Sequence, residues 1–197
     1  PIQSKAIIPI CDGKDLIAQA QSGSGKTGAF VIGALTKVNV EVKSPQVIIV
    51  ANTRELATQI NMVVKNIGKF IKVGDTDLRT TMCVGGASYD ARTNLRDALA
   101  SHVLIGTPGR LVDIMERGRR MNNELDNLKI LVLDEADKLL GDDFKDQLQK
   151  IFGNIPKQCQ VCLFSATFTQ DVIDLTKKFL INPIKILVQN EKISVES

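Results

Sequence analysis

Short apolar runs recur along the chain, and the longer segments between them place their apolar residues at the spacing of a helix. Such short runs, bounded by Gly, Pro, Asp and other turn residues, are typical of buried strands. The strand-like runs cover residues 16–19, 46–51, 79–84, 102–105, 129–133, 160–165 and 184–188. Alternation of these strands with helices predicts an α/β fold, with a parallel β-sheet flanked by helices on both faces.

Three of the intervening segments carry a helical pattern. After residue 25, a buried helix is indicated by Ala29, Phe30, Ile32, Gly33 and Leu35. Between the second and third strands, helical spacing is kept by Leu56, Ile60, Val63, Val64, Ile67 and Phe70. One helix is predicted after the acidic residues 134–137, with one face formed by Phe144, Leu148, Ile151 and Phe152. We find no internal repeat or linker, so residues 1–197 are predicted to form a single domain.

The segment AQSGSGKT, residues 20–27, lies between the first strand and the first of these helices. Gly23 and Gly25 fall at the bend, where positive φ and close approach of the backbone cost least. Amide groups at the start of the helix attract anions, Lys26 adds a mobile cation, and Thr27 adds a hydroxyl suited to Mg²⁺. The loop therefore predicts a site for a Mg²⁺-nucleotide.

The loop departs from the usual pattern G-x-x-x-x-G-K-[ST], because Ala20 stands at the first glycine position. A glycine- and serine-rich surface turn before a helix would also account for the segment. A carboxylate site at the end of another strand would favour the nucleotide, because the metal needs a second support.

Acidic residues follow directly after the apolar run 129–133. The order Asp134-Glu135-Ala136-Asp137 places carboxylates at the carboxyl edge of a sheet, where open α/β folds bind ligands. We expect Asp134 to hold Mg²⁺ through water, and Glu135 to orient or deprotonate the attacking water. The alternative is an acidic helix N-terminus, which interacts favourably with the helix dipole. That alternative does not account for the pairing of these acids with a phosphate loop at Lys26.

Together with the sequence SAT at residues 165–167, the sequence DEAD at residues 134–137 resembles the first RecA-like domain of the DEAD-box RNA helicases, which are P-loop NTPases. Further pieces of that family pattern occur in the same order: IQ at residues 2–3, AQSGSGKT at 20–27, TRELA at 53–57, GG at 85–86 and TPGR at 107–110. The match covers essentially the whole chain. Two departures stand, since Asn52 replaces the usual Pro and Ser24 replaces a common Thr.

The resemblance implies that the nucleotide is ATP and assigns the residues of its site. The implied nucleotide-binding residues are Gln3, which would read the adenine, Ser22, Gly23, Ser24, Gly25, Lys26 and Thr27. The implied catalytic residues are Lys26, Asp134 and Glu135, and Thr27 and Asp134 would support Mg²⁺. The implied residues that couple nucleotide to RNA-bound closure are Asp137, Ser165 and Thr167.

Aromatic residues make up only 4% of the chain, with a single Tyr, so base stacking is a poor basis for RNA binding. Contact with the sugar-phosphate backbone fits better. Candidate donors in loops after strands are Thr53, Arg54, Gly85, Gly86, Thr107 and Arg110. Each alone is more often an ordinary cap or turn; the resemblance identifies their ligand as single-stranded RNA.

Composition narrows the class of protein further. No stretch reaches 18 apolar residues, which argues against a membrane span, and the net charge of +3 permits RNA contact without requiring it. Cys159 and Cys162 form a C-x-x-C without a second pair, so we interpret them as reduced, buried or half-buried thiols of an intracellular protein, cytoplasmic or nuclear. For His102 we expect a packing or surface role.

The resemblance also implies a two-domain parent. We expect this chain to be an excised first domain, while a second RecA-like domain in cis would supply arginine fingers, so the isolated chain would be nearly inactive. The parent would be a monomeric, RNA-dependent ATPase that unwinds short RNA duplexes or remodels RNA–protein complexes, with a regulatory protein partner in some settings. Two alternatives stay open: a P-loop switch or small-molecule kinase, and an RNA clamp that uses ATP as a latch.

Two parts of the chain resemble different branches of the family. Residues 174–197 are similar to the translation initiation factor 4A group, including its nuclear exon-junction relatives. Residues 154–168 are similar to the messenger-RNA export branch. We favour the initiation factor 4A group.

Overall fold

The computed structural model describes residues 2–85, 95–121, 125–141 and 144–187. Its helices are α1 (Ile2–Cys11), α2 (Lys26–Leu35), α3 (Arg54–Gly68), α4 (Leu95–Leu99), α5 (Pro108–Arg119), α6 (Ala136–Gly141), α7 (Lys145–Asn154) and α8 (Gln170–Phe179). Its strands are β1 (Leu16–Gln19), β2 (Val47–Val50), β3 (Lys72–Val73), β4 (Thr76–Asp77), β5 (Thr80–Cys83), β6 (Val103–Gly106), β7 (Ile130–Leu133), β8 (Gln160–Ser165) and β9 (Ile184–Ile186).

Seven of these strands form one sheet in the order β5-β6-β2-β7-β8-β1-β9, and every neighbouring pair is parallel. Each corresponds to one of the predicted runs, so the predicted parallel sheet is confirmed. All seven strands therefore end at the same edge. The loops that follow them carry the motif residues.

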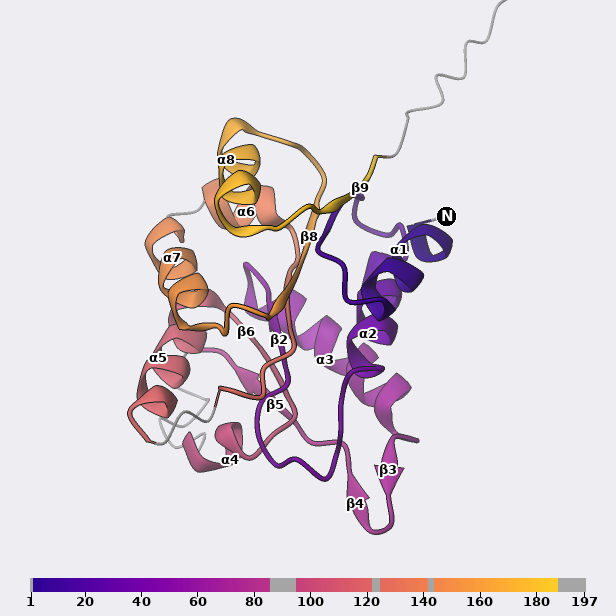
Figure 1. The fold of residues 1–197 in the computed structure, drawn as a ribbon, viewed down its shortest axis with the longest axis vertical. Coiled ribbons are helices and arrows are strands. Elements are labelled where there is room, and N and C mark those ends of the chain that lie inside the picture. The colour runs from indigo at the N-terminus through magenta and orange to yellow at the C-terminus, as the bar shows by residue number, and fades with distance from the viewer. Residues whose placement is uncertain (1, 86–94, 122–124, 142–143, 188–197) are drawn as a thin grey trace, which may run out of the picture.

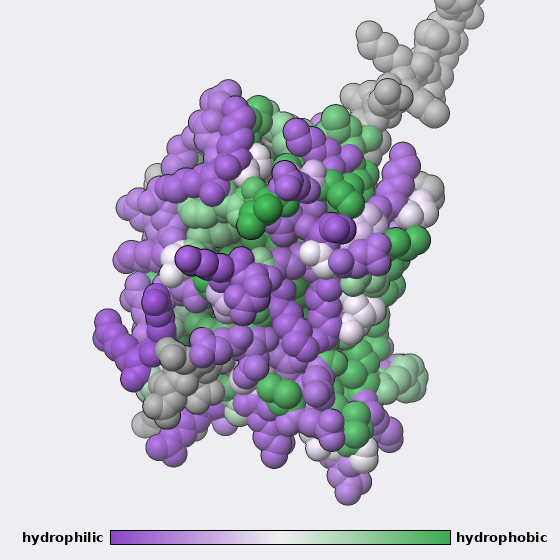
Figure 2. All heavy atoms as spheres, viewed as in Figure 1, coloured by the Kyte–Doolittle hydropathy of each residue, from purple (hydrophilic) through white to green (hydrophobic). Residues whose placement is uncertain are grey.

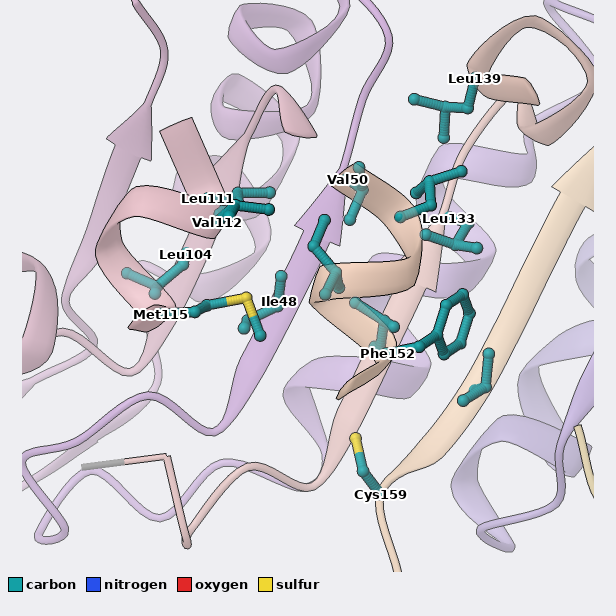
Figure 3. Packing of buried hydrophobic residues seen from close by; sticks show 14 of the residues in the cluster. Ile48, Val50, Leu104, Leu111, Val112, Met115, Leu133, Leu139, Phe152 and Cys159 are labelled. Carbon is teal, nitrogen blue, oxygen red and sulfur yellow. The ribbon is translucent and has the colours of Figure 1, made fainter. Parts of the chain in front are cut away.

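Helices cover both faces of the sheet, as predicted (Figure 1). Along β2, Val47 and Ile49 belong to a core cluster with α1, α2 and α3. Ile48 and Val50 point to the opposite face and pack with residues of α4 to α8, such as Met115. Figure 3 shows this second cluster, in which side chains from the strands meet those of the covering helices. The continuous apolar runs in the sequence follow from this burial on both sides.

The direction in which the chain crosses the sheet explains which helices lie on which face. From β1 the chain moves through β2 to β5 at one edge, and then returns through β6, β7 and β8 to β9 at the other edge. Parallel crossovers are right-handed, so a reversal of direction moves the connecting helices to the opposite face. Helices α2 and α3 belong to the first leg, and α4 to α8 belong to the second.

The structure differs from the predicted elements in two places. The single helix predicted after residues 134–137 is two helices: α6 ends at Gly141, and Phe144 precedes α7 as its N-cap. Phe144 still packs against the core with Leu148, as the spacing indicated. The second difference is the antiparallel hairpin of β3 and β4, which was not predicted because its two-residue strands are short and largely exposed.

Cys159 and Cys162 are buried free thiols that form no disulfide. Burial raises the pKa of Cys159 to about 12. Burial raises the pKa of Cys162 as well. In the parts of the chain that the structure describes, no helix combines the length and apolarity that a membrane crossing needs.

His102 is fully buried at the amino end of β6 and has a packing role. The backbone N–H of Arg79 donates to His102 Nδ1 at 2.9 Å, so Nε2 carries the proton and donates to the carbonyl oxygen of Val40 at 3.0 Å. Burial lowers the pKa of His102 below its usual 6.5. The hydrogen bond to Val40 raises the pKa and the nearby charge of Arg79 lowers it, but burial has the largest effect. The folded protein therefore holds this imidazole neutral.

We predict that this neutral imidazole makes folding stability depend on pH. The unfolded chain binds a proton at His102 that the folded chain does not, so stability falls as pH drops below about 6.5. Urea unfolding of the wild type and of His102→Gln at pH 7.5 and 5.5 tests this. The wild type is expected to lose more stability over this interval than the variant; equal losses would contradict the prediction.

Candidate nucleotide and RNA site

The predicted phosphate loop joins the carboxyl end of β1 to the start of α2. Gly23 and Gly25 adopt left-handed φ values of 79° and 84°, as the bend required. Gly25 precedes the first helical residue, Lys26, without a side-chain cap. The first amide groups of a helix have no intrahelical partner, so they are available to an anion at this loop.

Gln3 reaches the same loop from α1. Its Nε2 donates to the carbonyl oxygen of Gly25 at 3.3 Å. A Cβ atom at position 25 would lie 2.8 Å from this Nε2, so the close approach of α1 also favours glycine there. The structure therefore brings Gln3 to the phosphate loop, although the two are far apart in sequence.

Lys26 and Asp134 meet between the phosphate loop and the end of β7. Lys26 Nζ lies 2.9 Å from Asp134 Oδ1, and their side chains are 6% and 0% exposed. Burial raises the pKa of Asp134, and the ammonium of Lys26 acts against that rise. The other oxygen, Oδ2, is buried and has no hydrogen-bond partner in the structure. A buried carboxylate oxygen without a partner suits a metal-bound water or a cation.

Glu135 follows Asp134 in a strained conformation. Its φ is 52°, a left-handed value that is uncommon for residues other than glycine, and such strain concentrates at functional sites. Its backbone N–H donates to Asp134 Oδ1 at 3.0 Å. Its carboxylate pairs with Lys138, with Oε2 and Nζ 2.9 Å apart. The turn thus places the carboxylate of Asp134 in the buried site beside Lys26 and that of Glu135 beside Lys138.

Asp137, Ser165 and Thr167 form one hydrogen-bonded network that joins the start of α6 to the end of β8. Asp137 Oδ2 accepts from the backbone N–H and the hydroxyl of Thr167, at 3.1 and 2.8 Å. The backbone N–H of Asp137 donates to Ser165 Oγ, which in turn donates to the Thr167 carbonyl oxygen at 2.7 Å. Burial alone would raise the pKa of Asp137, but these hydrogen bonds outweigh it and lower the pKa.

The predicted RNA residues lie after β2, β5 and β6, which are neighbours at one side of the sheet. Thr53 caps α3, since its hydroxyl accepts from the backbone N–H of Leu56 at 3.1 Å, and Arg54 is exposed. Thr107 precedes α5 and its hydroxyl makes no capping bond. Gly85 follows β5 and is exposed, whereas the predicted Gly86 lies outside the described residues.

Arg110 is held by an acid of its own helix. Its guanidinium forms an ion pair with Asp113, which also lies 3.6 Å from Arg117. An anion that binds Arg110 therefore competes with Asp113. Apart from Gln3 on α1, the predicted nucleotide residues occupy the other half of this edge, after β1, β7 and β8, so the carboxyl edge carries two adjacent groups of predicted residues.

Three residues of this edge were not predicted from the sequence: Lys138, Asp113 and Gly106. The first two pair with Glu135 and Arg110 at a spacing of three residues, a helical spacing that could have indicated both. Gly106 of β6 pairs with Cys83 of β5, and a Cβ there would lie 2.0 Å from the carbonyl oxygen of Cys83. No sequence signal reveals that approach, because it depends on which strands are neighbours.

We predict that Gly106→Ala destabilises the fold, because the Cβ meets a backbone atom that cannot rotate away. Overpacking of this kind costs about 1–3 kcal/mol. Gly153→Ala is the matched control, since Gly153 lies in α7 with open space around it, and alanine there should stabilise by up to about 1 kcal/mol. Urea unfolding of both variants checks this; a neutral Gly106→Ala would contradict the close approach.

A hollow of the surface with a volume of about 590 Å³ lies away from this edge. It is lined by Lys65, Lys69, Arg79 and neighbouring residues near the amino ends of β5 and β6. At the phosphate loop, the ion pair of Lys26 and Asp134 occupies the space between loop and strand. The geometry of the motif residues, rather than the size of a cavity, therefore identifies the site.

Comparison with known proteins agrees with this geometry. A family model described as DEAD/DEAH box helicase matches residues 1–175. The ATP-dependent RNA helicase eIF4A of Candida glabrata is 43% identical over 196 residues, a match that covers 99% of this chain and 47% of that relative. The ATP-dependent RNA helicase fal1 of Schizosaccharomyces pombe is 44% identical over 195 residues, with 99% and 47% covered. The chain spans about half the length of the curated relatives it matches.

Solved structures share the fold. Saccharomyces cerevisiae Dbp5 bound to RNA and ADP BeF3 matches with a TM-score of 0.80 at 36% identity, covering 95% of this chain and 46% of Dbp5. A DEAD box protein from the hyperthermophile Methanococcus jannaschii matches with a TM-score of 0.82 at 30% identity, covering 95% and 49%. The predicted RecA-like fold and the likeness to initiation factor 4A are confirmed, and the chain belongs to the DEAD/DEAH box helicase family.

Proposed function

We propose that this chain is the ATP-binding domain of an ATP-dependent RNA helicase, with residues 1–197 as the first of two RecA-like domains. The observation that carries the proposal is the 2.9 Å contact between Lys26 of the phosphate loop and Asp134 of the acidic motif. Two segments far apart in the sequence thereby form one buried polar site, as hydrolysis of a nucleotide requires. A chance glycine-rich turn would not meet a buried acid at its lysine.

Each group has a role in this proposal. The loop residues Ser22 to Gly25 would present backbone amides to the phosphates of ATP, and Lys26 would leave Asp134 to bind them. Thr27 and the unpaired Oδ2 of Asp134 would support Mg²⁺, which neutralises phosphate charge when bound. Glu135 would orient the attacking water and accept its proton. Gln3 would read the adenine from its place against the loop.

The other half of the edge would hold single-stranded RNA by its sugar-phosphate backbone. The residues proposed for this are Thr53, Arg54, Gly85, Gly86, Thr107 and Arg110. The solved RNA complex of yeast Dbp5, a relative at 36% identity, supports the assignment of the ligand. The network of Asp137, Ser165 and Thr167 lies at the end of β8, between the two strands that carry the phosphate loop and the acidic motif. We propose that this network reports nucleotide binding to the RNA-binding half.

The whole protein would need a second RecA-like domain in cis. That domain would bring arginines to the phosphates, whose loss lowers the rate by about 10³- to 10⁵-fold, so this chain alone should hydrolyse little ATP. We propose a monomer, located in the cytoplasm or nucleus, that closes on ATP and RNA and separates short duplexes. Yeast Dbp5 has been solved with Gle1 and Nup159, which supports a regulatory protein partner here.

Titration of the chain with fluorescently labelled ATP, with Mg²⁺ and with a chelator, tests the nucleotide site. We expect weak binding that needs Mg²⁺, displacement by unlabelled ATP and much weaker displacement by GTP. Asp134→Asn should remove the Mg²⁺ dependence. Equal displacement by GTP, or binding that ignores Mg²⁺ in the wild type, would contradict the proposal.

Thr167→Val should uncouple the two halves of the edge. It removes the hydroxyl that donates to Asp137 at 2.8 Å, and hydrogen bonds to a charged group contribute about 1.5–3 kcal/mol, so stimulation of ATP turnover by RNA should fall about tenfold or more. Turnover is measured in the complete protein with and without single-stranded RNA. Thr167→Ser keeps the donor and should restore stimulation; an unchanged ratio in Thr167→Val would show that the network has no coupling role.

A further inference from the structure

A groove separates α8 from β9, next to the loop after β8 that carries Thr167. Its volume is about 260 Å³, and it is lined by Ile17, Phe168, Ile173, Thr176, Lys177, Lys185 and Leu187. Alternation along β9 explains the lining. Ile186 points to the cluster on the α1 to α3 side, so Lys185 and Leu187 point toward α8.

The groove lies at an edge of the sheet. Among the described residues, β9 pairs with β1 alone, so its outer edge is open to another chain. Two apolar side chains are exposed beside it: Ile181 is 70% exposed and Leu187 55%. Figure 2 shows hydrophobic surface interrupting the hydrophilic one at the end of the molecule where α8 and β9 lie. Exposed apolar side chains gathered at one place indicate a contact surface.

The charge of the groove has a single sign. Lys177 and Lys185 belong to its lining, and no carboxylate does. Neither ammonium takes part in an ion pair with the residues that the structure describes. The position of Lys177 in the last turn of α8 is favourable for the helix dipole, but this does not account for Lys185 on the strand. An occupant with acidic groups beside apolar ones would complement both features.

We propose that this groove binds a short segment of a partner protein that carries apolar side chains flanked by carboxylates. The apolar lining without arginine fits a peptide better than RNA, whose proposed contacts lie after β2, β5 and β6 on the other half of the sheet. Phe168 forms one wall and directly follows Thr167, so an occupant would lie beside the Asp137 network. The proposal goes beyond the ATP-binding function and does not depend on it.

A pair of labelled peptides tests the groove. The probes are fluorescein-labelled EDLFEILD and its uncharged counterpart QNLFQILN, and binding to the whole chain is followed by fluorescence anisotropy. We expect the acidic peptide to bind at least tenfold more tightly than the uncharged one. Lys177→Glu and Lys185→Glu should each weaken its binding tenfold or more. Lys178→Glu changes a neighbouring lysine that does not line the groove and should stay within twofold.

The outcomes separate this proposal from others. Equal loss in Lys178→Glu would indicate general attraction to a basic surface and overturn it, as would equal binding of the two peptides or no binding. Displacement of the acidic peptide by single-stranded RNA would assign the lysines to RNA instead. Self-association of the chain that the same two variants abolish would assign the groove to a second copy. ATP binding is measured in parallel, so a failed groove and a failed nucleotide site remain distinguishable.

Discussion

Replacing Lys26 with methionine is expected to weaken both the fold and ATP binding. Asp134 is fully buried and Lys26 is its charged partner at 2.9 Å. Removing one member of a buried ion pair leaves an uncompensated charge and costs about 3–5 kcal/mol. The same substitution removes the cation proposed for the phosphates. Urea unfolding and titration with labelled ATP measure the two losses separately.

The double variant Lys26→Met/Asp134→Asn separates stability from binding. Asparagine removes the buried charge, so much of the lost stability should return, whereas ATP binding should stay lost. Lys43→Met is the matched control, because Lys43 is exposed and should change neither property by more than about 0.5 kcal/mol. A Lys26→Met protein as stable as the wild type would show that the buried pair is not formed in solution.

The second large effect is expected for Glu135→Gln, which should abolish turnover of ATP while leaving its binding intact. An amide cannot accept the proton of the attacking water, and a well-placed general base contributes about 10²- to 10⁴-fold to the rate. The substitution preserves the size of the side chain and leaves the left-handed backbone at residue 135 as it is. Steady-state ATP turnover in the complete protein, with saturating single-stranded RNA, measures the loss.

Lys138→Gln controls for the ion pair that Glu135→Gln also removes. The side chain of Lys138 is 60% exposed, and exposed pairs contribute only about 0.2–1 kcal/mol, so turnover should change by less than about fivefold. If Lys138→Gln reduced turnover as strongly as Glu135→Gln, the ion pair rather than the carboxylate as base would account for the loss.

The body of the fold was readable from the sequence because its strands are buried on both faces. Runs such as Val47–Val50 and Ile130–Leu133 are continuously apolar, and a strand with this pattern needs helices on both sides to cover it. The hairpin of β3 and β4 gave no such signal, since its strands are short and mostly exposed. The break between α6 and α7 was hidden because Phe144 continues the apolar face of the helix that follows.

The residue types of the site were readable as well, but their contacts were not. A lysine after a glycine-rich turn and an acid after a strand predict a phosphate site. Their meeting depends on the sheet order, in which β8 separates β1 from β7. Spacing in the sequence does not reveal that order. The close approach at Gly106 depends on the same three-dimensional information, whereas the pairing of Arg110 with Asp113 follows a helical spacing that the sequence does contain.

The most direct test of the proposed helicase function is ATP turnover by the protein extended through its downstream region, measured with and without single-stranded RNA. We predict low turnover without RNA, a clear rise when RNA is added, and loss of that rise in Glu135→Gln. If ATP binds but turnover stays flat with every RNA tested, ATP would act as a latch on an RNA clamp, and the proposed helicase function would be wrong.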